Sequence, residues 1–382
     1  MQLRHRPYVI AGVALIGAGV IAATPIAPPV PEVQVSDIRL TAGDATDIVI
    51  DVVRHAQMIS PFEDELTGSP AYPGAPLSDL GQQQAQDVGT QLFNELGQHV
   101  AGIFAGQGLR EMETAAPFAA LENMSNNVQI LPGLDEIDSG IYAFDPIDST
   151  GGQLAFLTAG AWSLGSPFGL SLLPAPGSSD TNGIVFDARF TDAIDTMYDD
   201  AVTNPVVSAD GQITDVAFNS EASIFVWTLM NVKNPDLPFF IQQIIESHTV
   251  PNGLSTVLLP NTGIVQIEGN PTDGWTLVSW DGQAIPQDPD LLTALFVDVR
   301  DVALPAQTAL WNISEALAGG DPTTILSAVQ TGFDQVGSAL VQFPESVVDS
   351  IVDAVHNLGT AAGAQAAGEA GLSLSDVLAS LF

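Results

Sequence analysis

Cysteine is absent from this chain, and basic residues are scarce. The 382 residues contain no cysteine, which excludes disulfide bonds, thiolate metal ligands and cysteine nucleophiles. Lys and Arg together number 8, against 45 Asp and Glu, and the formal net charge is −37. A surface of this charge repels nucleic-acid backbones and anionic membranes. We therefore expect no nucleic-acid partner, and a site that binds phosphate would have to gather some of the few cations locally.

The N-terminal segment has the composition of a targeting signal. Residues 4–6 are basic or histidine, the run 9–23 is apolar, and small residues and prolines follow up to residue 27. This order is that of a secretory signal peptide. The apolar run of about 15 residues is shorter than the roughly 20 that a membrane span needs. We expect residues 1–27 to be a signal peptide, with an N-terminal membrane anchor as the second interpretation. Both predict a secreted or cell-envelope-associated protein.

Strand-like and helix-like segments alternate after a proline-rich linker over residues 28–45. The β-branched run 48–53 indicates a buried parallel strand. Ser78 can cap a helix that ends at Gly97. Further strands are expected over 100–105 and 213–218, helices over 190–201 and 222–232, and a hairpin that joins 262–268 to 275–280. This alternation predicts an α/β fold, a layered sandwich with a mostly parallel sheet, over residues 46–300.

Two regions do not follow this alternation. Residues 145–182 are rich in Gly, Ser, Pro and Leu without steady periodicity, and we interpret them as an irregular insertion or lid. Residues 301–382 carry apolar side chains at three- and four-residue steps, which predicts a C-terminal helical appendage. Its helices are expected to pack on the main domain or on each other, because the polar face lacks the cations that favour membrane binding.

Four short motifs follow one another in the first part of the chain. Arg54 and His55 stand at the end of the first predicted strand, where side chains of an α/β sheet meet a ligand crevice. The segments 77–85 (LSDLGQQQA), 110–115 (REMETA) and 134–140 (LDEIDSG) come after it. An Arg-His pair alone is a weak signal, whereas the ordered series of four motifs is specific.

This series resembles the histidine phosphatase (phosphoglycerate mutase-like) superfamily. Its members share an Arg-His-Gly start, a Leu-Ser/Thr-x-x-Gly-x-x-Gln-Ala helix, an Arg-x-x-Glu/Gln-Thr-Ala helix and a Leu-x-Glu-x-x-x-Gly turn. The resemblance covers residues 46–140 well and residues 213–281 more loosely. It implies a phosphoglycerate mutase-like fold and hydrolysis of a small phosphomonoester, with no metal and no organic cofactor.

The resemblance also implies a role for each matched residue. His55 would attack phosphorus and form a phosphohistidine that water then hydrolyses. Glu136 would protonate the leaving oxygen and later help to activate water. Arg54 and Arg110 would hold the phosphate oxygens, since guanidinium groups bind them in pairs. Judged from the residues alone, both arginines could instead form surface salt bridges, and Asp135 could either raise the pKa of Glu136 or be a solvated turn residue.

One position departs from the family pattern. The family places a second histidine in a Ser-His-Gly segment at a strand end, whereas Ser220 stands at that place here and Glu221 adds a negative charge. His248, which also follows a serine, is the rival candidate, with an ordinary loop histidine as the other interpretation. Two hypotheses therefore stay open: a phosphatase that uses His55, and a catalytically impaired member that binds a phosphorylated ligand or a protein partner in the cell envelope.

Overall fold

The computed structural model describes residues 45–59, 73–97, 99–248 and 258–358. All of them lie in one structural unit, residues 44–382. The predicted signal peptide 1–27, and the predicted linker 28–45 except for its last residue, lie outside the described residues.

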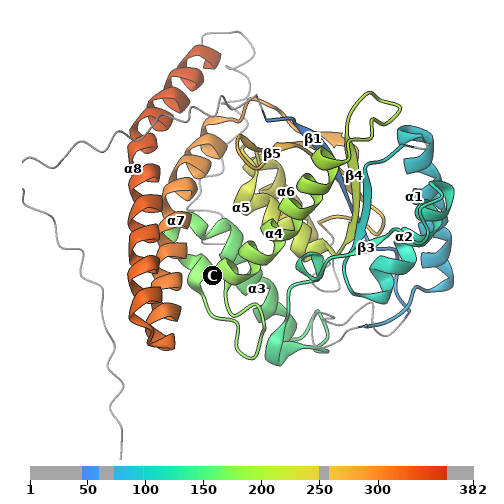
Figure 1. The fold of residues 1–382 in the computed structure, drawn as a ribbon, viewed down its shortest axis with the longest axis horizontal. Helices are drawn as coiled ribbons and strands as arrows, with labels where there is room; N and C mark the ends of the chain where they lie inside the picture. The colour runs from blue at the N-terminus through green and yellow to red at the C-terminus, as the bar shows by residue number, and fades with distance from the viewer. Residues whose placement is uncertain (1–44, 60–72, 98, 249–257, 359–382) are drawn as a thin grey trace, which may run out of the picture. The chain divides into compact units, whose positions relative to one another are not determined.

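A mixed seven-stranded sheet forms the centre of the unit (Figure 1), in the order β3-β2-β4-β1-β5-β6-β7. The first four strands of this order are parallel neighbours, and β5, β6 and β7 continue the sheet in antiparallel pairs. Their bounds are β1 (Ile48–Arg54), β2 (Gly102–Ala105), β3 (Gln129–Ile130), β4 (Thr214–Asn219), β5 (Ile264–Asn270), β6 (Gly274–Trp280) and β7 (Gln283–Ala284). The predicted α/β fold, the parallel strands at its centre and the hairpin β5–β6 are confirmed.

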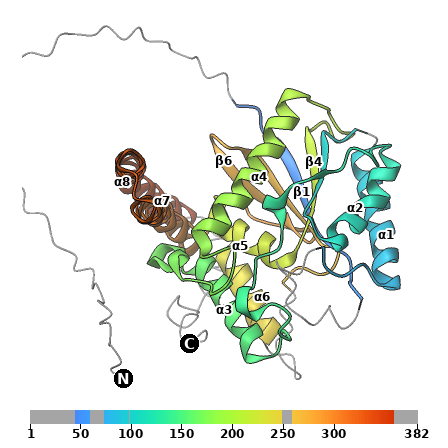
Figure 2. The same ribbon diagram turned by 60° about the horizontal axis from the view of Figure 1, so that its bottom comes forward.

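Helices cover both faces of the sheet (Figure 2). They are α1 (Asp79–Leu96), α2 (Leu109–Leu121), α3 (Thr150–Leu164), α4 (Gly183–Thr203), α5 (Glu221–Asn231), α6 (Leu237–His248), α7 (Leu291–Gly319) and α8 (Pro322–Leu358). β1 carries apolar residues on both sides because each side meets a helical layer. Ile50 packs in one cluster with Phe190 of α4, whereas Val53 packs in the other with Leu92 of α1 and Phe118 of α2.

The segment 145–182 is more regular than the irregular insertion that its composition predicted. It contains the helix α3, whose first turn is capped by the Ser149 side chain, which accepts a hydrogen bond from the Gly152 N–H. The helical period is hidden in the sequence because α3 is apolar on several sides. Trp162 is buried, while Leu154 and Leu157 are exposed on the same helix.

The helix α7 runs through the predicted boundary between residues 300 and 301. It begins where the Asp290 side chain accepts hydrogen bonds from two N–H groups of its first turn. Arg300 is buried, and its Nη1 donates to the carbonyls of Leu229 and Val232, both at 3.0 Å. These contacts fix α7 to the main domain, and α8 packs along α7 (Figure 1). Among the described residues, none of the helices combines the length and the apolar character needed to cross a membrane.

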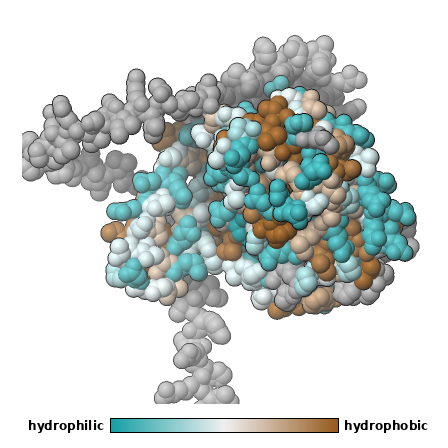
Figure 3. Space-filling model, turned by 45° about the vertical axis from the view of Figure 1, so that its right-hand side comes forward, coloured by the Kyte–Doolittle hydropathy of each residue, from teal (hydrophilic) through white to brown (hydrophobic). Residues whose placement is uncertain are grey.

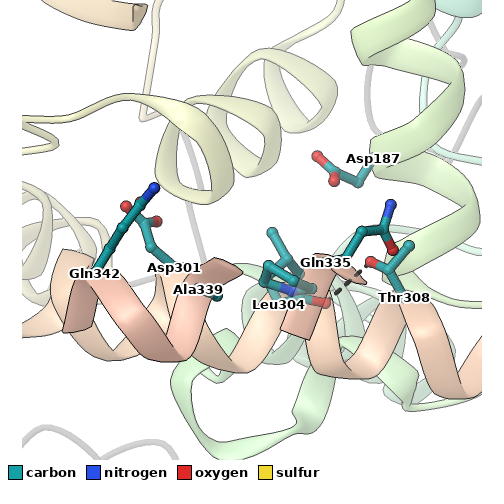
Figure 4. A pocket seen from close by; sticks show the side chains of 8 residues that line it. Asp187, Asp301, Leu304, Thr308, Gln335, Ala339 and Gln342 are labelled. Carbon is teal, nitrogen blue, oxygen red and sulfur yellow. Dashed lines mark hydrogen bonds between the residues drawn. The ribbon is translucent and has the colours of Figure 1, made fainter. Parts of the chain in front are cut away.

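A groove of about 390 Å³ lies where α7 and α8 meet α4 (Figure 4). Asp187 of α4 and Asp301 of α7 line it, together with Gln335 and Gln342 of α8. Elsewhere on the surface, apolar patches lie between hydrophilic side chains (Figure 3). The residues that line the groove include none of the sequence-predicted site residues.

Candidate active site

The ends of β1 and β4 place the motif residues at one edge of the sheet. The two strands are parallel neighbours, and Arg54 lies opposite Asn219 in their register. His55 follows β1 directly, and its backbone N–H donates to the Asn219 carbonyl at 2.8 Å. Ser220 follows β4 and stands before the first residue of α5. The carboxyl ends of two adjacent parallel strands thus meet where α/β proteins bind ligands.

The imidazole of His55 is buried and neutral. Its Nδ1 lies 2.8 Å from the carbonyl oxygen of Ala56, so Nδ1 carries the proton that this carbonyl accepts. Nε2 therefore keeps its lone pair. Burial, with the positive charges of Arg110 and then Arg54, holds the pKa of His55 well below its usual range. A neutral ring with a lone pair on Nε2 is the form that attacks phosphorus.

Arg110 lies in the first turn of α2 and is fully buried. Its Nε and Nη2 donate to the Ser220 hydroxyl oxygen at 3.3 and 3.0 Å. The same Nε lies 2.9 Å from Oε1 of Glu111, and the Ser220 hydroxyl donates to that carboxylate at 2.7 Å. Each of these three side chains contacts the other two, and the Ser220 hydroxyl links the cation to the anion.

Arg54 is held by a carboxylate of its own. Its Nη1 lies 2.7 Å from Oε2 of Glu221 and donates to the Leu259 carbonyl at 2.5 Å. The other oxygen of Glu221 accepts the backbone N–H groups of Leu258 and Leu259. The pairing of Arg54 with Glu221 therefore joins β1 to the start of α5 and to the segment before β5.

Glu136 lies in the loop after the short 3₁₀ helix Pro132–Leu134 and is partly buried. Its Oε1 accepts the Ile137 N–H at 2.7 Å and lies 3.0 Å from the Ser223 hydroxyl of α5. Burial raises the pKa of Glu136; the charge of Arg110 opposes that shift and the charge of Glu111 adds to it. The contact with Ser223 joins Glu136 to α5, the helix that follows Ser220 and begins with Glu221.

A further arginine holds the loop that carries Glu136. Arg189 of α4 donates to the carbonyls of Gly133, Asp135 and Glu136 at 2.8, 2.9 and 3.2 Å. The carboxylate of Asp180 pairs with the same guanidinium group at 2.6 Å. Arg189 was missed in the sequence because it belongs to no motif. Residue spacing does not predict hydrogen bonds between a helix and a loop that lies more than fifty residues earlier in the chain.

His248 is the last residue of α6, a helix, and not the end of a strand. Its backbone therefore lies in neither of the two predicted settings, a strand end or a loop, and its side chain lies outside the described residues. Ser220, the other candidate for the second-histidine position, does lie in the site. Over the described part of the chain, no group of three or more His, Asp or Glu side chains is arranged to hold a metal ion.

Comparison with known proteins agrees with the motif series. Residues 50–151 match the model of the histidine phosphatase superfamily (branch 1). The matched range includes His55, Arg110 and Glu136. The resemblance predicted from the four motifs is thereby confirmed for residues 50–151.

The chain is also similar to the PE-PGRS family protein PE_PGRS11 of Mycobacterium tuberculosis, with 47% identity over 313 residues. The match covers 82% of this chain and 50% of that protein, so this chain spans about half the length of the relative. Among solved structures, a chain described as mycobacterial hydrolase 1 has a TM-score of 0.44 at 18% identity, over 62% of this chain and 100% of that one. A phosphoglycerate mutase from Bacillus anthracis str. Sterne has a TM-score of 0.40 at 18% identity, over 62% of this chain and 94% of its own.

Proposed function

We propose that this chain hydrolyses small phosphomonoesters through a phosphohistidine intermediate on His55. The observation that carries this proposal is the neutral, buried imidazole of His55 beside two guanidinium groups, those of Arg54 and Arg110. Buried donors beside it support the same conclusion: Nε of Arg54 and Nδ2 of Asn219 have no hydrogen-bond partner among the described residues. Buried polar groups in proteins are usually paired, so donors of this kind suit an anionic ligand.

The chemistry proceeds in two displacements. In the first, Nε2 of His55 attacks phosphorus opposite the ester oxygen, and the P–O bond breaks as the P–N bond forms. Glu136, whose raised pKa favours the acid form, gives its proton to the leaving oxygen. In the second, water attacks phosphorus and gives a proton to the Glu136 carboxylate. The P–N bond then breaks, phosphate leaves and neutral His55 is restored.

The two guanidinium groups would stabilise negative charge on the phosphoryl oxygens and would not transfer protons. Phosphoryl transfer spreads negative charge over the three equatorial oxygens, and most of its catalysis is positioning and charge stabilisation. Arg110 is rigid because α2, Ser220 and Glu111 surround it. Arg54 is fixed at the end of β1, next to the attacking residue. We further propose, from residues 1–27, that this activity is secreted or attached to the cell envelope.

Replacing Glu136 by Gln tests this mechanism through the leaving group. We expect Glu136→Gln to slow hydrolysis of an alkyl phosphate by about a hundredfold or more, the usual contribution of a general acid. Hydrolysis of 4-nitrophenyl phosphate should slow much less, because nitrophenolate leaves without a proton. Initial rates with both esters, for this variant and for Glu95→Gln at an exposed position on α1, measure the difference. An equal loss for both esters would argue against Glu136 as the proton donor.

Arg189 should behave as a positioning residue for Glu136. Arg189→Lys keeps the charge but loses the fork that binds three carbonyls, and we expect a loss of about tenfold or more on the alkyl phosphate. The loss on 4-nitrophenyl phosphate should again be smaller, a pattern that general destabilisation would not produce. Lys233→Arg, at an exposed cation, is the control. If Arg189→Lys loses activity equally on both esters, Arg189 does not act by positioning Glu136.

A second candidate function is phospholigand binding without turnover. It is favoured by Ser220 at the place of the family's second histidine and by the carboxylates that hold both arginines. Such a protein would bind phosphate but release none from an ester. Transient labelling of wild-type protein by a radioactive phosphomonoester separates the two, because only the hydrolase forms a covalent phosphoenzyme.

A further inference from the structure

Both arginines that would hold a phosphate group are occupied by carboxylates of the chain itself. Arg110 pairs with Glu111, and their side chains are 0% and 1% exposed. Arg54 pairs with Glu221, and these side chains are 13% and 16% exposed. A carboxylate and a phosphate group offer the same kind of oxygen to a guanidinium fork. Each glutamate therefore fills contacts that a phosphate oxygen would need.

These pairs change the charge that a ligand meets. Two guanidinium groups beside a neutral His55 would give the site a net positive charge, which attracts a phosphate dianion. With Glu111 and Glu221 ionised, the charges cancel. A dianion entering beside an ionised Glu221 would face a like charge at close range in a partly buried site, which is strongly unfavourable.

The two glutamates differ in how they are held. Glu111 is enclosed by Arg110 and by the Ser220 hydroxyl, and it is fully buried. Glu221 is the first residue of α5, is partly accessible, and is bound to Arg54 and to the N–H groups of Leu258 and Leu259. We therefore expect a ligand to replace the carboxylate of Glu221 at Arg54, and not the carboxylate of Glu111 at Arg110.

The charged groups around Glu221 come from three sides. Arg54 pairs with it from β1, and His55 is next to Arg54 in the chain. The charge of Glu136 acts on it from the loop after the 3₁₀ helix. Arg110 and Glu111 lie on α2 and contact Ser220, the residue before Glu221. Burial raises the pKa of Glu221 to about 7; the charge of Arg54 opposes the shift and that of Glu136 adds to it. The carboxyl can thus lose or gain its proton near neutral pH.

We propose that Glu221 is an internal competitor of the phosphate group: its carboxylate holds Arg54 in the free site, and a ligand dianion binds Arg54 only when this carboxyl is protonated. Binding of a dianion is then coupled to uptake of one proton. Neutral Glu221 can still donate a hydrogen bond to a ligand oxygen, so protonation converts a repulsive neighbour into a favourable one. This regulation rests on the proposed phosphate site.

Sulfate is the probe that tests whether Glu221 competes with a dianion for Arg54. It stays a dianion near neutral pH, whereas phosphate changes its charge. We expect the dissociation constant of sulfate for the full chain to fall about tenfold per pH unit on acidification above the pKa of Glu221, the slope for uptake of one proton. In Glu221→Gln, sulfate should bind at least about tenfold more tightly than in wild type at pH 8, with little dependence on pH. Glu136→Gln should keep the wild-type slope, which assigns the proton to Glu221.

Calorimetry of wild-type protein gives a second measurement that needs no variant. Titrating sulfate at pH 8 in two buffers of different ionisation enthalpy reports the protons taken up, and we expect close to one. If no proton is taken up, or if wild type and Glu221→Gln bind sulfate with equal affinity at pH 8, the proposal that Glu221 competes with the ligand is wrong. Sulfate binding with the expected slope but without ester hydrolysis would instead overturn the hydrolase alone. Failure of every form to bind sulfate, even at acidic pH, would overturn both proposals.

Discussion

Replacing His55 by alanine is expected to abolish both the hydrolysis of 4-nitrophenyl phosphate and the covalent labelling of the chain by a radioactive phosphomonoester. The loss should be at least about a thousandfold, because removal of a nucleophile eliminates the covalent route and leaves only binding and charge stabilisation. The label on wild-type protein should be lost in acid and survive in alkali, as a phosphorus–nitrogen bond does. The fold should persist, because alanine fits where the buried ring stood and the backbone bond from His55 N–H to Asn219 is kept.

His99 offers the matched control. It is exposed just before β2, so His99→Ala also removes one imidazole and should leave rate and labelling at the wild-type level. The measurements are release of nitrophenolate and scintillation counting of denatured protein after a brief incubation. A His55→Ala protein that still acquires an acid-labile label would mean that another residue is the nucleophile, and the phosphohistidine would have to be placed elsewhere.

Much of the fold follows from local signals that the sequence displays openly. The apolar run of β1, the Ser78 cap of α1 and the strand β4 were all predictable, because burial on both faces and capping leave marks on short segments. The helix α3 was not, because its apolar residues are spread around the helix and its buried face shows only once Trp162 is seen against Phe186 of α4.

The candidate site also has features that the sequence predicts and features that it does not. His55, Arg110 and Glu136 stand in motifs that the sequence displays, and Arg110 contacts Ser220 after the end of β4. The pairing of Arg54 with Glu221 could not be predicted, although Glu221 was recognised as a negative charge near the site. This pairing depends on the register that sets Arg54 opposite Asn219, and it joins two residues more than a hundred positions apart in the chain. Side-chain contacts across such distances leave no local pattern.

The folded chain is expected to be more stable at mildly acidic pH than at neutral pH. Burial raises the pKa of several carboxyl groups: to about 6 for Asp51 and Asp187, to about 7 for Glu221, and well above its usual range for Asp215. A carboxyl whose folded pKa exceeds its unfolded pKa contributes its full stability below the unfolded value and loses it as the pH rises through the folded value. For these groups that window runs from about pH 4 to about pH 7 and beyond.

Thermal unfolding followed by circular dichroism measures this effect. We expect the midpoint Tm to be at least about 5 °C higher at pH 5 than at pH 8, since each unit of pKa shift is worth about 1.4 kcal/mol before screening. Protonation also reduces the mutual repulsion of a chain whose net charge is −37. A Tm that stays level or falls on acidification would mean that these carboxyl groups are solvated in the folded protein.

Asp215 should account for a large share of the effect. It is fully buried on the central strand β4, where burial raises the pKa of its carboxyl and the charge of Asp200 adds to the shift. Asp215→Asn keeps the shape and removes the titration, so we expect a higher Tm than wild type at pH 8 and nearly the same Tm at pH 5. Asp87→Asn, at an exposed position on α1, removes one negative charge without burial and should change neither value appreciably. If Asp215→Asn lowers the Tm equally at both pH values, the wild-type side chain is ionised and satisfied inside the sheet, and the acid stabilisation must come from the other carboxyl groups.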